Sequence, residues 1–144
     1  MPTRRALIAG LALLPLASPA LAHSYKADKV RIGHPWTQPT RDAVTDVFIA
    51  LLNTGDVVDR LVGASTPIAT GVRIVDLVAG LPAEVEALEL LPMRPVPMRP
   101  GARSLRLSGL NRPLVLGDRF PLTLEFARSG RVEVEIYVEL EPGH

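Results

Sequence analysis

Residues 120–140 read FPLTLEFARSGRVEVEIYVEL, and this stretch decides the fold. On either side of Ser129-Gly130, apolar residues stand at every second position, which is the period of a strand with one buried face. A short glycine-containing turn between two such strands produces an antiparallel hairpin. The predicted inner face of the hairpin holds Leu122, Leu124, Phe126, Val132, Val134, Ile136, Val138 and Leu140.

Strand patterns continue from this hairpin toward the N-terminus. Arg103 to Leu107 alternates in the same way, and Val44 to Leu52 is an almost continuous apolar run followed by an Asn-Thr-Gly-Asp turn. About eight or nine short strands, turn residues every ~8–12 positions and no convincing helix occur along the chain. The sequence therefore predicts an all-β fold, an antiparallel β-sandwich with Greek-key connections.

The N-terminus carries the three parts of a secretory signal peptide. Residues 1–5 form a basic head, residues 6–17 an almost wholly apolar run, and residues 18–22 end in the small-x-small pattern of a signal peptidase site. The apolar run is shorter than the ~20 residues needed to span a bilayer. We therefore expect cleavage of residues 1–22 and a single periplasmic domain, residues 23–144, without membrane attachment. Arg4-Arg5 alone leaves both the general and the twin-arginine export routes open.

Composition excludes several classes of function. Removing residues 1–22 removes two of the 16 basic side chains and none of the 15 acidic ones, so the remaining charge of −1 gives no sign of a nucleic-acid partner. The chain has no cysteine, so a metal ion would be held by histidine, methionine, carboxylate or backbone. It also lacks a nucleophile motif, a catalytic carboxylate pair and a glycine-rich phosphate loop, so we do not expect an enzyme.

Cleavage after Ala22 would make His23 the first residue of the mature chain. Its α-amine and Nδ1 could then chelate one metal ion, and the imidazole of His34 could complete three nitrogen donors, an arrangement called a histidine brace. Residues 26–29 can reverse the chain to bring the two histidines together, and Pro35 should hold His34 in an extended backbone. Because nitrogen donors in a planar array suit Cu(II), we predict a Cu(II) site formed by His23 and His34 after processing.

A set of turn and core signatures is spread over essentially the whole mature chain. It comprises Ala22-His23, His34-Pro35-Trp36, Asn53-Thr54-Gly55-Asp56, Asp59-Arg60-Leu61-Val62-Gly63-Ala64, Pro100-Gly101, Gly109-Leu110, Pro113-Leu114, and Gly117-Asp118 with Phe120-Pro121-Leu122-Thr123-Leu124. These signatures resemble the PCu(A)C family of periplasmic copper chaperones. The resemblance implies a cupredoxin-like β-sandwich that acts in copper acquisition or delivery, with the copper ion and a copper-accepting protein as its partners.

The resemblance also implies a Cu(I) site of two histidines and two methionines, from which this sequence departs. The family's His-x-Met pair falls on Ser104 and Arg106, and its first histidine falls on Val75. An arginine has no lone pair to donate and repels a cation. Met93 lies in a tract like the one around the family's first methionine, but too far from Val75 in sequence. We therefore expect the usual Cu(I) site to be absent.

Other interpretations of these residues stay open. His23 can be a frayed terminus and His34 a structural residue packed on Trp36, in which case the chain is a metal-free scaffold that binds a protein partner. Met93 and Met98 could bind Cu(I) through their thioethers, although methionines more often fill apolar gaps. Five arginines with no acid between them could steer an acidic partner, although arginines at exposed strand edges are usually solvated. These are Arg94, Arg99, Arg103, Arg106 and Arg112.

Overall fold

The computed structural model describes residues 24–141, and all regular secondary structure in that range is β-strand. The strands are β1 (Ser24–Ala27), β2 (Val30–Thr37), β3 (Val44–Asn53), β4 (Asp59–Ser65), β5 (Gly71–Val78), β6 (Leu81–Val85), β7 (Leu88–Leu90), β8 (Val96–Pro97), β9 (Ser104–Ser108), β10 (Arg119–Phe126) and β11 (Gly130–Val138). Among these residues there is accordingly no helix that could cross a membrane.

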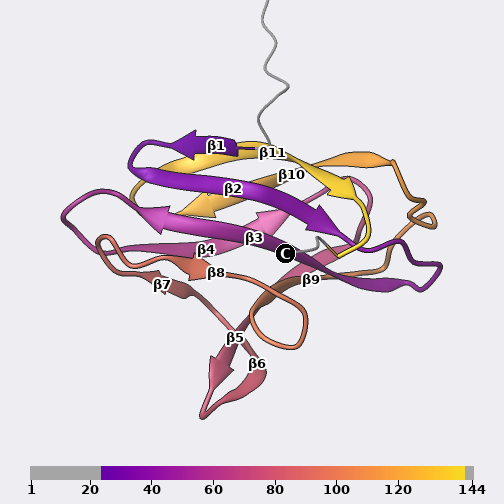
Figure 1. Cartoon of the computed structure of the whole chain (residues 1–144), viewed down its shortest axis with the longest axis horizontal. Helices are drawn as coiled ribbons and strands as arrows, with labels where there is room; N and C mark the ends of the chain where they lie inside the picture. The colour runs from indigo at the N-terminus through magenta and orange to yellow at the C-terminus, as the bar shows by residue number, and fades with distance from the viewer. Residues whose placement is uncertain (1–23, 142–144) are drawn as a thin grey trace, which may run out of the picture.

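The strands join into one continuous sheet that folds over on itself around a single core. Their order is β6-β5-β9-β3-β2-β11-β10-β4-β7, with β1 also paired to β2 and β8 to β3. Figure 1 shows the stacked strands and the β5–β6 hairpin, which projects from the body. Neighbours such as β3 and β9 or β2 and β11 are distant in sequence, as Greek-key connections require, so the predicted all-β fold class is confirmed. The pairs are antiparallel except β2 with β11, which is parallel.

The C-terminal hairpin forms as the sequence predicts. β10 pairs antiparallel with β11 from Arg119 to Phe126, and the alternate apolar side chains of both strands face the core. Gly130 begins β11 with a φ of +81°, a conformation that glycine adopts without steric cost. Leu140 is an exception to the prediction: β11 ends at Val138, and Leu140 is 68% exposed outside the core.

A buried asparagine joins β3 to the β7 end of the sheet. The Asn53 side chain donates from Nδ2 to the carbonyls of Val57 at 2.8 Å and Leu90 at 2.9 Å. The backbone carbonyl of Asn53 accepts the N–H of Met93 at 2.8 Å. Buried polar groups are stable only when they are hydrogen-bonded, and these bonds satisfy Asn53 while they nearly close the sheet into a barrel.

Candidate metal centre

His34 lies where β2 exchanges one partner strand for another. Over Val30–Gly33, β2 pairs with β1, and from Trp36 onward it pairs with β11. On its other edge the register with β3 shifts between Gly33 and Trp36, so the extra residue forms a β-bulge. His34 has a φ of +45° in this bulge. The predicted extended backbone at His34 is therefore wrong: the bulge imposes a left-handed conformation, which histidine adopts more readily than most residues.

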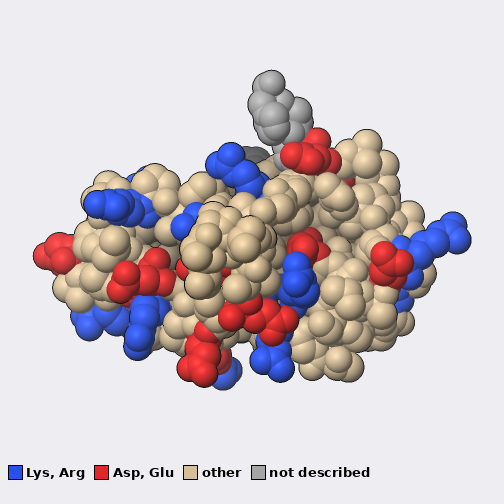
Figure 2. Space-filling model, turned by 90° about the horizontal axis from the view of Figure 1, so that it is seen from below, with Lys and Arg blue, Asp and Glu red and all other residues tan. Residues whose placement is uncertain are grey.

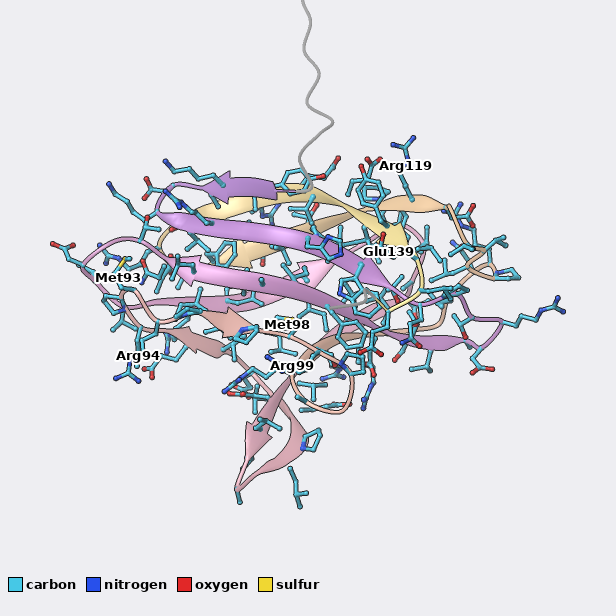
Figure 3. The ribbon with its side chains drawn as sticks, viewed as in Figure 1. Met93, Arg94, Met98, Arg99, Arg119 and Glu139 are labelled. Atoms are coloured by element: carbon cyan, nitrogen blue, oxygen red, sulfur yellow. The ribbon has the colours of Figure 1, made fainter. Side chains whose placement is uncertain are left out.

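The bulge places the His34 ring beside a carboxylate from the end of the chain. His34 Nε2 lies 2.8 Å from Glu139 Oε1, and 47% of the histidine side chain is exposed. The Glu139 N–H donates to the Thr37 carbonyl at 2.9 Å, which fixes the backbone of Glu139 against β2. Figure 3 shows Glu139 at the end of β11. When Nε2 carries the proton donated to the carboxylate, Nδ1 is the nitrogen that holds the ring's lone pair.

β1 brings the N-terminal end of the described chain to the same place. Ser24, the first residue of β1, lies directly opposite Gly33, which precedes His34. The predicted chain reversal at residues 26–29 is thus confirmed, because β1 pairs antiparallel with β2. His23 lies outside the described residues, so the pairing of His23 with His34 stays a prediction.

The positions at which the resemblance implies Cu(I) ligands lie close together but carry other chemistry. Val75 of β5 lies directly opposite Ser104 of β9, and both are at most 2% exposed. Arg106 forms a two-bond ion pair with Asp46 of β3, with Nε–Oδ1 at 2.9 Å and Nη2–Oδ2 at 3.3 Å. The hydrogen bond to Asp46 raises the pKa of Arg106 above its ordinary value. A buried aliphatic group and a fixed cation therefore occupy this place.

The two methionines of the proline-rich segment do not share a site. Met98 is 7% exposed and packs in the core, whereas Met93 is 63% exposed. Their N–H groups donate to the carbonyls of Ile49 and Asn53, which lie four residues apart on β3, a separation of about 13 Å along a strand. Figure 3 shows Met93 near one end of the molecule and Met98 near its middle. The two thioethers are therefore too far apart to bind the same ion.

Two of the five clustered arginines are neutralised by carboxylates. Arg103 Nε lies 2.7 Å from Asp76 Oδ1, and Arg106 is paired with Asp46. Figure 2 shows basic and acidic side chains interspersed over the face seen from below, without a continuous basic area. The simpler interpretation, solvated and paired arginines on strands, therefore fits this face better than an electrostatic docking site.

Glu139 is the potential site residue that the sequence analysis missed. Alternation along β11 puts Glu139 in phase with Glu133 and Glu135, which indicates an outward side chain, but no local signal predicts the parallel pairing of β11 with β2. Within residues 24–141, no three histidine or carboxylate side chains gather closely enough to hold a metal ion. A site of three histidine or carboxylate ligands that includes His34 would therefore need a residue from outside this range.

Comparison with known families gives one match that spans most of the chain. The model of the LpqE-like family, described as "Putative lipoprotein LpqE-like", matches residues 30–138. These residues run from the start of β2 to the end of β11. No curated protein matches the chain.

Several solved structures share the fold. The copper-bound PCuAC domain from PmoF2 is 26% identical, with a TM-score of 0.75, and the match covers 83% of this chain and 99% of that domain. The Cu(I) form of DR1885 from Deinococcus radiodurans is 25% identical, with a TM-score of 0.65 and 83% of each chain covered. The apo PCuAC domain from PmoF1, at 22% identity and a TM-score of 0.75, shows the shared fold alone.

Proposed function

This chain belongs to the LpqE-like family and has the cupredoxin-like fold of PCuAC domains, and on that basis we propose that it is an exported copper-binding protein. Residues 1–22 act as a signal peptide, and the mature chain, residues 23–144, works outside the cytosol in copper acquisition or delivery. The ion is Cu(II), held by the α-amine and Nδ1 of His23 and by the imidazole of His34. Copper is the cargo, and a copper-accepting protein is the partner.

The observation that carries this proposal is the register between β1 and β2. Ser24 lies opposite Gly33, and the antiparallel pairing runs without irregularity through all four residues of β1. In this proposal the register continues by one step, which would place position 23 opposite His34. Residues directly opposite each other in such a pair have Cα atoms about 4.5–5.5 Å apart and share one face, so two imidazoles at these positions can reach one ion.

Glu139 supports the proposal because it orients the His34 ring. Histidines that bind metals usually donate their second ring N–H to a carboxylate, which fixes the tautomer and the ring plane. The 2.8 Å contact between His34 Nε2 and Glu139 Oε1 is of this kind, and it supports the proposal that a metal ion binds at the other ring nitrogen, Nδ1. Since Glu139 is itself held by the Thr37 carbonyl, the ring is oriented before any ion arrives.

The donor atoms favour Cu(II) over Cu(I). An amine and two imidazoles are nitrogen donors that suit Cu(II), whereas thioethers select Cu(I). The positions of the family's Cu(I) ligands hold Val75, Ser104 and Arg106 here, and the arginine is paired with a carboxylate. We therefore infer a change of site and of oxidation state relative to DR1885, whose solved form contains Cu(I).

Titration of Cu(II) into protein purified after export tests this function. Trp36 is the only tryptophan in the sequence. It stands two residues from His34, and its ring packs at a tilt of 40° against Phe48, with ring centroids 4.9 Å apart. A paramagnetic Cu(II) ion at His34 should therefore quench its fluorescence at one equivalent. We expect this quenching to disappear in His23→Ala and in His34→Ala and to persist in His144→Ala, which removes the third histidine and serves as the control.

The start of the mature chain provides an independent check. Mass spectrometry should find His23 as the first residue, and one alanine added before it should remove tight binding, because the α-amine then belongs to another residue. Wild-type affinity in the extended protein would contradict the brace. If protein that starts at His23 binds no Cu(II), the metal-free partner-binding scaffold becomes the better function. The Arg106–Asp46 pair supports the metal-free part of that alternative, because it puts a paired cation where the resemblance implies a copper ligand.

A further inference from the structure

An open groove with a volume of about 660 Å³ lies on the outer face of β1, β2 and β3. Its size falls in the range of ~300–1,000 Å³ that is usual for ligand sites. The residues that line it include Lys26, Arg31, Gly33, Ala50, Leu52 and Pro95. The groove contains neither His34 nor Glu139, so its chemistry is separate from the proposed copper site.

The floor of the groove is hollow because two small residues face each other there. Gly33 of β2 lies directly opposite Ala50 of β3. A Cβ atom built on Gly33 would meet only the Ala50 Cβ, at 4.0 Å, so no larger side chain fills the space. Leu52, two residues along β3, and Pro95 add apolar walls. This part of the groove can therefore accept an apolar side chain.

The rim of the groove holds two cations that face each other across adjacent strands. Lys26 of β1 lies directly opposite Arg31 of β2, and both are exposed. Like charges at directly opposite positions destabilise a strand pair. Among the described residues, neither side chain forms an ion pair. A lysine on the short strand β1 protects a sheet edge from aggregation, but edge protection does not require a second cation opposite it.

We propose that this groove binds an extended, acidic segment of another protein. The segment places a carboxylate between Lys26 and Arg31 and an apolar side chain over Gly33 and Ala50. Arg31 and Gly33 are two residues apart on one face of β2, which is about 6.6 Å along a strand. An extended peptide repeats its side chains at the same interval, so a segment that runs antiparallel to β2 has an apolar residue followed two positions later by an acidic one.

The groove fits an acidic protein segment better than an anionic membrane surface. Lipid headgroups are recognised by clusters of about 4–8 basic residues, whereas two cations line this groove. A lipid surface is also flat, while the Gly33–Ala50 hollow requires a side chain that projects from a defined backbone position. The groove therefore fits a protein segment that presents one apolar and one acidic side chain at a fixed spacing.

Nuclear magnetic resonance with a defined peptide tests this inference in copper-free protein, so failure of the copper proposal leaves the test intact. The probe is a short capped peptide with Leu-Ser-Glu at its centre, and the control peptide has Gln in place of Glu. With the first peptide we expect amide shifts that concentrate at Lys26, Arg31, Gly33 and Ala50. The affinity for the control peptide should be at least about tenfold weaker.

Charge-reversal variants separate a loss of peptide binding from a loss of folding. The double variant Lys26→Glu with Arg31→Glu should lose peptide binding. The single variant Lys26→Glu should also lose peptide binding, but its melting temperature should rise, because the substitution replaces a repulsive cross-strand pair by an attractive one. Arg41→Glu with Arg112→Glu changes the net charge by the same amount at exposed loop positions and should bind as wild type. A loss of binding that accompanies a lower melting temperature in Lys26→Glu would contradict the inference.

Three other outcomes would overturn the proposal. Equal shifts with the glutamine peptide would show that the carboxylate is not recognised. Equal shifts with free glutarate would make the groove a small-anion site. Binding to phosphatidylglycerol vesicles that depends on Lys26 and Arg31, in the absence of peptide binding, would assign the groove to a membrane surface.

Discussion

The Asp59 carboxylate holds the turn between β10 and β11 against the start of β4. It is 3% exposed and accepts hydrogen bonds from the N–H groups of Arg60, Arg128 and Ser129 and from Ser129 Oγ, at 2.7 to 3.1 Å. Burial by itself raises the pKa of Asp59, but the bond from Ser129 Oγ and the three backbone bonds outweigh it and hold the pKa below its ordinary value. The charged form of Asp59 therefore stabilises the fold.

Asp59→Asn should lower the free energy of unfolding by about 1–3 kcal/mol at neutral pH, because hydrogen bonds to the anion are lost. A group whose folded-state pKa is depressed contributes stability above its unfolded pKa of about 3.9 and loses it as the pH falls through the lower folded-state value. Urea unfolding should thus show a constant difference from wild type between about pH 5 and 7 that closes below about pH 4. Asp56→Asn, at an exposed position three residues earlier, is the control; a difference that persists at low pH would contradict the role of the charge.

The Glu139 carboxylate should matter for copper affinity more than for folding. If Glu139 orients His34, Glu139→Ala should weaken Cu(II) binding by about 10–100-fold, while Glu139→Gln, which keeps an acceptor oxygen, should weaken it less. Isothermal titration calorimetry measures both. Glu133→Ala, on the same face of β11, should bind as wild type, and equal affinities for all three variants would show that Glu139 has no part in the site.

At the scale of secondary-structure elements, the β5–β6 hairpin is closed by a strained two-residue turn. Ala79 and Gly80 have φ values of +55° and +83°, and Val78 pairs with Leu81 on either side of them. Both central residues of such a turn need positive φ, for which Asn-Gly is the preferred sequence. The alanine therefore carries a backbone cost that an asparagine would reduce.

Ala79→Asn should raise the free energy of unfolding by about 0.5–1 kcal/mol, and Gly80→Ala should lower it by about 1–2 kcal/mol. A Cβ at Gly80 meets no atom within 4 Å, so the second change reports backbone strain alone. Chemical denaturation of the two variants beside wild type measures both effects. Changes of the same sign in the two variants would mean that contacts at the hairpin tip, rather than φ, decide its stability.

The elements differ in how far the sequence could predict them. Alternation of apolar residues and the turn at Ser129-Gly130 are local signals, so the β10–β11 hairpin could be predicted with its inner face. The bulge at His34 and the parallel pairing of β2 with β11 depend on where a strand from the far end of the chain settles. No local pattern encodes that contact, which is why the backbone at His34 was predicted wrongly and Glu139 was missed.

At the scale of the whole molecule, the strand order brings together the positions at which the resemblance implies Cu(I) ligands. Val75 and Ser104 are cross-strand neighbours, and Arg106 is two residues from Ser104 on the same face of β9. The sequence could predict that these positions carry no soft donors. It could not predict the partner of Arg106, because Asp46 reaches it from a strand 60 residues away in sequence.

Restoring soft ligands at these positions should restore Cu(I) binding. The combined variant Val75→His, Ser104→His and Arg106→Met, with Asp46→Asn to avoid an unpaired carboxylate, supplies two imidazoles and a thioether on one face. Competition with a chromophoric Cu(I) chelator should reveal one bound equivalent, against none for Asp46→Asn alone. A folded variant without Cu(I) binding would show that the three side chains do not converge.

The contact between His34 and Glu139 links the second strand of the sandwich to the residue that follows the last one. A chain truncated before its final strand lacks Glu139 and cannot form this contact, and contacts between such distant segments are slow to form. The His34 imidazole is therefore oriented by Glu139 only in a chain that has folded with its last strand in place. Incomplete copies would present that ring without its carboxylate, and under the proposed function we expect them to bind copper more weakly.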